Sequence, residues 1–259
     1  MSGTRKLNWS GWSIFALLLL LWEIGSRLNP KLQLYIPPIG QILSTLVEMI
    51  SSGQVAGHAW VTLRRFAEGY FLAAALGVTL GMILGYFRFV HSLAAMVIEF
   101  LRPMPSVAII PVAILLLGIG DSMITAVTVY ASMWPILINT IDGVRYVERT
   151  LVDTGRTFGL SRRQILWHVI LPAASRYIVT GLRVSLSIAL ILVTTAEMIA
   201  GSQGLGFFIL DEERSLNSSA MYAGIILVAL LGYSLNRLFL TLESKTMKWH
   251  RGAAAREAI

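Results

Sequence analysis

The sequence contains no cysteine, which excludes disulfide bonds, thiolate metal sites and a cysteine nucleophile. Histidine is also scarce, and His58, His91, His168 and His250 lie too far apart along the chain to indicate a ligand cluster. No His or Asp cluster and no nucleophile with a nearby base marks an enzyme site within an apolar stretch. We therefore expect neither a metal nor a cofactor on this chain.

Charged residues are also few, at 14% of the chain, whereas 56% of the residues are hydrophobic. This composition is far too apolar for an ordinary soluble domain. The formal net charge of +7 does not indicate nucleic-acid binding, because the basic residues flank apolar segments and form no stripe with interleaved aromatic side chains. We expect the lipid bilayer to be the main solvent of this protein.

Six apolar stretches approach the length of about 20 residues that a helix needs to cross a bilayer. They cover roughly residues 11–28, 69–87, 103–119, 122–140, 177–200 and 220–240. Because the runs are continuous and lack the alternation of barrel strands, they predict an all-α bundle of about six transmembrane helices. The first run resembles a secretory signal peptide, but no small-residue cleavage site follows it, so we interpret it as an uncleaved span.

Basic residues are distributed unevenly among the connections between these stretches. Six arginines lie in the long connection from about 141 to 176, and further lysines and arginines lie in the C-terminal tail. The positive-inside rule then places both termini and this connection in the cytoplasm. Arg64 and Arg65 contradict the pattern, because this topology puts them on the outer side, where the 201–219 connection is acidic.

The second stretch carries Gly77, Gly81 and Gly85 at four-residue spacing, which puts them on one helix face. Such a face allows another helix backbone to approach closely, although glycine is also common in membrane helices without this role. We predict a helix-packing seam there.

Proline interrupts the third and fourth stretches, at 103, 105 and 111 and at Trp134-Pro135. Irregular backbone at membrane depth is tolerated where it is buried in protein or lines a cavity. These two spans are candidates for a solute pathway, and simple proline kinks are an equally good explanation.

The connection between the fourth and fifth stretches has the pattern of two short helices around a tight turn. The first helix is predicted over about 147–158, and Gly159 is suited to the left-handed conformation that ends it. Ser161 and Gln164 form a capping-box pattern for the second helix, which we expect Pro172 to close.

Side chains of both short helices are expected to form a contact surface for another molecule in the cytoplasm. Ile165 and Val169 share one face of the second helix, and Thr154 and Gly155 form a small-residue spot on the first. The apolar side chains of the second helix thus form a protruding knob, and the small residues of the first helix form a surface that another molecule is able to approach closely.

This connection resembles the cytoplasmic loop of ATP-binding-cassette (ABC) importer permeases, whose pattern is Glu-Ala-Ala, three residues, Gly, nine residues and Ile-x-Leu-Pro. The spacing matches throughout, with conservative departures at the three opening positions. The resemblance implies a coupling helix that docks onto a separate ATPase subunit, formed by Asp153, Thr154, Gly155, Arg156, Gly159, Val169, Leu171 and Pro172.

Other segments resemble the nitrate, sulfonate and taurine branch of these permeases: 102–105, 118–121, 135–140, 196–199 and 204–206. The resemblance implies a permease domain over about 55–240 that includes the coupling loop 147–172. Residues 1–50 then form a first span with its outer connection, and residues 241–259 a cytoplasmic basic tail.

The resemblance also implies partners and a substrate class. The permease is expected in the bacterial inner membrane, in contact with lipid, as a homodimer or with a similar permease. Two ATPase subunits bind inside and a solute-binding protein outside. The expected substrate is an aliphatic sulfonate, taurine, nitrate or a similar anion, with bicarbonate or a vitamin precursor as the alternative.

Four side chains within the apolar stretches are candidates for the pathway: Glu197, Thr194, Asn139 and Trp134. An ionisable residue inside an apolar run indicates a functional site by default. Glu197 lines the pathway, pairs with a basic group such as Arg183 or lies at an exposed helix end. Asn139 either lines the pathway or bonds across helices.

The chain has no Gly-x-x-x-x-Gly-Lys-Ser/Thr motif, so ATP hydrolysis is expected on another subunit and the chain is not predicted to be an enzyme. A secondary transporter is the main alternative. It is disfavoured because no clear inverted repeat and no set of intramembrane carboxylates is visible. A purely structural membrane subunit would leave the docking hairpin unexplained.

Overall fold

A computed structural model describes residues 9–246 of the chain, and every regular element in that range is helical. The result confirms the all-α fold class. The helices are α1 (Trp9–Leu28), α2 (Pro30–Gln33), α3 (Ile39–Ser51), α4 (Ala56–Tyr86), α5 (Arg88–Leu101), α6 (Ile110–Leu117), α7 (Asp121–Arg145), α8 (Arg149–Thr157), α9 (Arg162–Ile165), α10 (Leu171–Ala200), α11 (Leu205–Arg214) and α12 (Ser218–Thr246).

Four of the described helical segments are long and apolar enough to cross a membrane, namely α4, α7, the continuous helix from Arg162 to Ala200, and α12. A fifth candidate consists of α5 together with the segment from Ser106 to Leu117, which are bent by 91° relative to each other. The predicted count of six is therefore not confirmed, although α1 is helical over the first predicted stretch.

The third predicted span, 103–119, was wrong as a continuous helix. Its only α-helical part is the eight-residue α6, which follows a 3₁₀ turn over Ser106–Ile109. Pro103 and Pro105 each lack a backbone N–H and disfavour the helical conformation of the residue before them, so the chain turns there.

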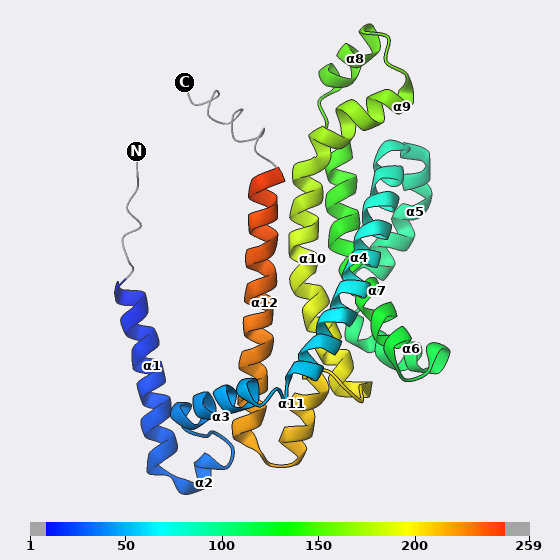
Figure 1. Cartoon of the computed structure of the whole chain (residues 1–259). Coiled ribbons are helices and arrows are strands. Elements are labelled where there is room, and N and C mark those ends of the chain that lie inside the picture. Colours follow the sequence, from blue (N-terminus) through cyan, green and yellow to red (C-terminus); the bar gives the residue numbers. More distant parts are fainter. Residues whose placement is uncertain (1–8, 247–259) are drawn as a thin grey trace.

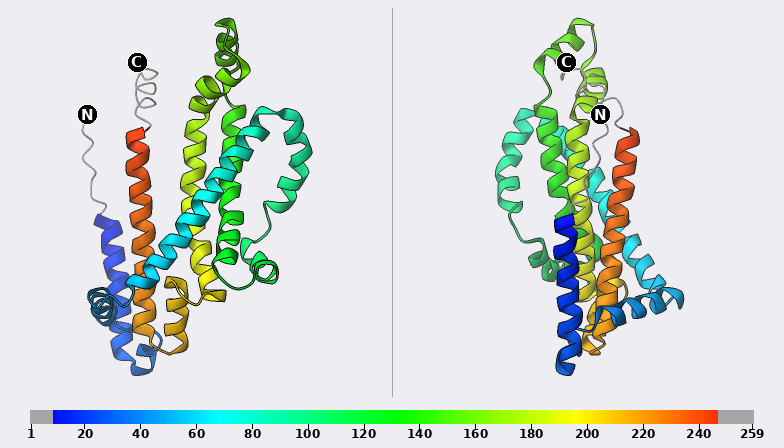
Figure 2. Two further views of the ribbon diagram at one scale, coloured as in Figure 1. Left: turned by 45° about the vertical axis from the view of Figure 1, so that its right-hand side comes forward. Right: turned by 90° about the vertical axis from the view of Figure 1, so that its left-hand side faces the viewer.

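The long helices run side by side, and the short elements gather at their two ends (Figure 1). The hairpin formed by α8 and α9 projects beyond the bundle at one end, which we call the hairpin end. At the opposite end, called here the α11 end, α11 joins α10 to α12, and α3 lies across the direction of the long helices (Figure 2).

The glycines of α4 form the predicted packing seam, and α7 is the partner. A Cβ atom at Gly77 would lie 2.9 Å from Ile136, and one at Gly81 or Gly85 would lie 2.5 Å from Thr140 or 2.6 Å from Val144. Each step of four residues on α4 matches a step of four on α7, so the two helices run parallel. The seam confirms that these glycines permit close backbone approach.

On its other side α7 packs against α10, so α7 is the central helix of the bundle. Here α10 supplies the glycine: a Cβ at Gly181 would meet the carbonyl oxygen of Pro135 at 2.9 Å. Nearer the α11 end, fully buried side chains of α6, α7 and α10 form the main apolar core, including Ile110, Ile124 and Val193.

Candidate functional site

The hairpin at the end of the bundle forms as its sequence predicts. Gly159 has φ +76°, the left-handed conformation that a residue with a side chain rarely adopts, and it comes just after Phe158, the C-cap residue of α8. Ser161 caps α9: its hydroxyl accepts from the Gln164 backbone N–H at 3.3 Å, and the Gln164 side chain accepts from the Ser161 N–H at 2.8 Å. The predicted capping box is confirmed.

Pro172 does not close the second helix, and that expectation was wrong. A π-helical segment, Leu166–Ile170, follows α9 and leads without a break into α10, so the helix continues from Arg162 to Ala200. Pro172 lies in the first turn of α10, the position where a missing N–H is tolerated. The wider π turn just before it also accommodates the proline ring.

Much of the expected docking knob packs inside the hairpin and does not face outward. A Cβ atom at Gly155 would lie 3.5–3.6 Å from side-chain atoms of Ile165, Leu160 and Val169, so the small residue lets α8 pack on the following helix. Gly155 and Ile165 are buried, which corrects the expectation that they face a partner. Of the two residues in the predicted small-residue spot, Thr154 and Gly155, only Thr154 is exposed.

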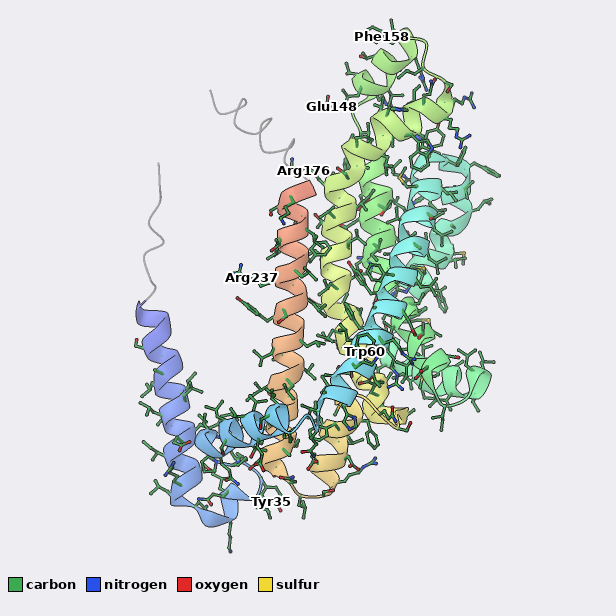
Figure 3. The ribbon with its side chains drawn as sticks, in the orientation of Figure 1. Tyr35, Trp60, Glu148, Phe158, Arg176 and Arg237 are labelled. Atoms are coloured by element: carbon green, nitrogen blue, oxygen red, sulfur yellow. The ribbon has the colours of Figure 1, made fainter. Side chains whose placement is uncertain are left out.

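The exposed surface of the hairpin carries large apolar side chains that the sequence pattern did not single out. Phe158 is 81% exposed, Trp167 57% and Leu151 47%. Phe158 lies near the tip, remote from the long helices (Figure 3). Asp153 and Arg156 form an exposed ion pair at 3.1 Å on the same helix. An apolar surface on a projecting segment is typical of an interaction site.

At the α11 end, Glu197 is completely buried and is held by donors from three directions. The Thr62 hydroxyl donates to it at 2.8 Å, the Arg65 guanidinium at 3.0 Å and the Gly206 N–H at 3.0 Å. The ion-pair partner is thus Arg65 on α4, and the suggested pairing with Arg183 was wrong.

Arg65 links three parts of the chain, although only 5% of it is exposed. Besides Glu197, its guanidinium donates to Asp121 at the start of α7, at 2.6 and 2.8 Å, and to the backbone carbonyl of Gln203 at 2.7 Å. Arg64 also pairs with Asp121. We call Thr62, Arg65, Asp121 and Glu197 the α11-end cluster. Both arginines that contradicted the charge pattern are therefore neutralised here.

Two glycines close the α11-end cluster from the side of α11. A Cβ atom at Gly204 would lie 2.2 Å from the Glu197 carboxyl carbon, and one at Gly206 would lie 2.1 Å from the Thr194 carbonyl oxygen. Gly204 also has φ +111°, and its N–H donates to the His58 ring at 3.2 Å. The Gly-Leu-Gly pattern thus reflects close contact with Glu197.

The four pathway candidates do not form one site. Asn139 donates to the Pro135 carbonyl of its own helix at 2.8 Å, so the suggested bond to another helix is not formed. Trp134 is 8% exposed and packs edge-on against Tyr130. Thr194, which also bonds to the backbone of α10, lines a hollow of about 240 Å³ between α10 and α12. Thr194 and Glu197 share α10, and Trp134 and Asn139 share α7.

Comparison with known proteins identifies the class of this chain. Residues 77–248 match the family model of the "binding-protein-dependent transport system inner membrane component". The chain is 29% identical to the putative aliphatic sulfonates transport permease protein SsuC of Bacillus subtilis, over 95% of this chain and 90% of that protein. It is 28% identical to the taurine transport system permease protein TauC of Escherichia coli, over 95% of each.

A third relative is the nitrate import permease protein NrtB of Synechocystis, at 31% identity over 88% of this chain and 86% of that protein. Among solved structures, a chain of the MetNI methionine ABC transporter in an inward-facing conformation has a TM-score of 0.63 at 20% identity. It covers 73% of this chain and 93% of that chain, which supports the same fold. The chain belongs to the binding-protein-dependent transport system inner membrane components and is the permease subunit of an ABC importer.

Proposed function

We propose that the hairpin end faces the cytoplasm and that the hairpin is the docking site for a separate ABC ATPase subunit. The observation that carries this proposal is the projecting α8–α9 hairpin, which has the importer loop spacing and exposes Phe158, Trp167 and Leu151. Aromatic side chains of this kind supply much of the binding energy at protein interfaces.

The charge distribution supports this orientation. The hairpin and its flanks contain six arginines. At the opposite end of the bundle, the last turn of α11 carries three consecutive acidic residues, Asp211, Glu212 and Glu213. Arg64 and Arg65 no longer count against it, because both pair with Asp121. The positive-inside rule then assigns the hairpin end to the cytoplasmic side. The described start of α1 and the described end of α12 both point toward the hairpin end, so they are assigned to the same side (Figure 1).

The continuous helix from Arg162 to Ala200 explains how ATPase movement reaches the membrane. A hairpin held by the ATPase moves with it, and the attached helix carries that motion as a rigid body toward the α11 end. Two permease copies working together then alternate between inward-open and outward-open arrangements. A solute-binding protein delivers the substrate at the α11 end.

The relatives indicate the substrate class. Their names assign aliphatic sulfonates, taurine and nitrate to SsuC, TauC and NrtB, respectively. These solutes share an oxyanion group, sulfonate or nitrate. We therefore assign a small sulfonate or similar oxyanion to this permease, with ATP consumed by the partner subunits and no cofactor on this chain.

Gly159→Val tests the docking role. A β-branched residue in the left-handed conformation costs about 1–3 kcal/mol, so the turn is expected to distort and the hairpin to lose its docking geometry. The measurement is a pull-down of the tagged permease from detergent-solubilised membranes, with the co-purifying P-loop ATPase quantified. We expect the ATPase with the native chain and little of it with the variant.

Gly53→Val is the matched control, because Gly53 has φ +73° and a Cβ atom added there, as at Gly159, would meet nothing within 4 Å. Gly53 lies between α3 and α4, in the part of the chain nearest the α11 end, so the variant introduces the same backbone strain away from the hairpin. Retention of the ATPase by Gly159→Val, or equal loss in both variants, would contradict the docking assignment.

A further inference from the structure

A cavity lies between α10 and α12, apart from both the hairpin and the α11-end cluster. It has a volume of about 840 Å³, and its lining includes Thr180, Arg183 and Ser187 from α10. On the α12 side, Tyr233 and Asn236 line it. The smaller hollow that contains Thr194 shares Ser187 and Tyr233 with it, so a continuous groove runs along the two helices toward the α11 end.

Arg183 is a charged residue of this cavity that lies deep within a membrane-spanning helix. It lies about 18 Å from the start of α10 and about 26 Å from its end at 1.5 Å per residue, well inside the span. It is exposed and makes no hydrogen bond or ion pair with any residue from 9 to 246. A charged side chain at such depth faces a bundle interior or a water-filled cavity, because exposure to hydrocarbon is costly.

Three further polar side chains of the lining have no hydrogen-bond partner within the described part of the chain. They are Ser187, Tyr233 and Asn236, so two hydroxyls and an amide are available beside the guanidinium. Each of these groups is able to donate a hydrogen bond, and the guanidinium presents a planar fork that matches two oxygens of one anion.

We infer that Arg183, with Ser187, Tyr233 and Asn236, forms a transient binding site for the oxyanion group of the transported solute. The inference rests on the proposed function and deepens it, because it places substrate recognition on this chain as well as on a binding protein. Sulfonate and nitrate both offer three oxygens that these donors are able to share.

Two other charged residues lie near the cavity, Glu243 and Arg237. Glu243 also lines it, seven residues beyond Asn236 and thus about 10 Å nearer the hairpin end. Glu243 has an interaction of its own and is not assigned to the site. Arg237 does not line the cavity: its side chain is on the face of α12 turned toward α1 (Figure 3), although its guanidinium lies over the Tyr233 ring at 5.8 Å.

The test uses the permease purified with its ATPase, and it measures binding of ethanesulfonate, taurine and nitrate by calorimetry, together with uptake into proteoliposomes. Arg183→Gln is expected to weaken binding at least about tenfold, and Arg183→Lys less, because lysine keeps the charge but loses the fork. Arg88→Gln is the matched control, an exposed arginine at the start of α5 that does not line the cavity, and it is expected to bind as the native protein does.

Three outcomes would overturn the inference. They are equal affinity in Arg183→Gln and Arg88→Gln, no binding of any of the three anions by the native complex, and loss of the permease dimer in Arg183→Gln. The last result would show that Arg183 pairs with the second permease copy. In each case the ATPase still co-purifies if the proposed function holds, so co-purification separates failure of this inference from failure of the function.

Discussion

Replacing Arg65 with Met tests whether the α11-end cluster holds that end of the bundle together. Methionine keeps most of the side-chain length but removes five hydrogen-bond donors. Glu197 would then remain fully buried with donors only from Thr62 and the Gly206 backbone, and Asp121 would keep only its exposed pairing with Arg64. The variant therefore leaves a buried carboxylate without its counter-ion.

The expected loss of stability is large because of this burial. Removing one partner of a buried ion pair costs about 3–5 kcal/mol. For a chain of this size each kcal/mol lowers the melting temperature by roughly 2–4 °C, so Arg65→Met should lower it by about 6–20 °C. Adding Glu197→Gln should recover part of this loss, because a neutral amide still accepts from Thr62 and Gly206 but needs no counter-ion.

Arg64→Met is the matched control, since Arg64 is the neighbouring residue and shares Asp121 but is 45% exposed at its side chain. Exposed pairs contribute about 0–1 kcal/mol, so its melting temperature should fall by less than about 4 °C. The assay is thermal unfolding of the detergent-purified protein, followed by loss of the monodisperse peak. Equal shifts for the two arginine variants, or no recovery in the double variant, would refute the reasoning.

Two further predictions concern packing and docking. Gly81→Ala should destabilise the protein by about 1–3 kcal/mol in the same unfolding assay, because the added Cβ would lie 2.5 Å from Thr140 and 3.0 Å from the Leu137 carbonyl oxygen. The control is Gly57→Ala in the same helix. Its Cβ would meet nothing within 4 Å, so this variant should be neutral or slightly more stable than the native protein. Phe158→Ala should weaken ATPase binding at least about fivefold in a titration of purified subunits, and Trp60→Ala, another largely exposed aromatic, on α4, should leave it unchanged.

The hairpin was predictable because its signals are local. Gly159 ends a helix through its own backbone conformation, and Ser161 and Gln164 cap the next helix across three residues. The glycine seam was half predictable: spacing on α4 indicated the packing face, but nothing in the sequence identified α7 as the partner. Local patterns specify the element and its face, and tertiary structure decides what covers that face.

The α11-end cluster was not predictable, because its members are far apart along the chain. Arg65 and Glu197 are separated by 132 positions, and Asp121 lies on a third helix. Arg64 and Arg65 did stand out, as basic residues where the topology expected none. Such a misplaced charge near a membrane surface is a signal for a buried partner, and the isolated carboxylate Glu197 was the complementary signal.

The errors at Pro103, Pro105 and Pro172 have one physical origin. A proline removes one backbone donor, and its effect depends on whether the surrounding turns absorb the loss. Before α6 the chain bends, whereas before α10 a π-helical segment widens the turn and the helix continues. Sequence spacing alone does not distinguish these outcomes, because they depend on tertiary packing: α9 packs on α8, and α10 packs along α7.

One rigid helix connects all three candidate sites, and this arrangement constrains how the permease works. The helix from Arg162 to Ala200 carries the hairpin at one end, Arg183 near its middle and Glu197 at the other end. Because Glu197 is fixed by the buried contact with Arg65, the far end of the helix has little freedom to slide. In the proposed mechanism we therefore expect movement of the hairpin to tilt the helix about the α11 end, and such a tilt displaces the middle of the helix against α12. The cavity around Arg183 lies between those two helices, so the proposed docking predicts that the shape of the cavity changes with ATPase movement.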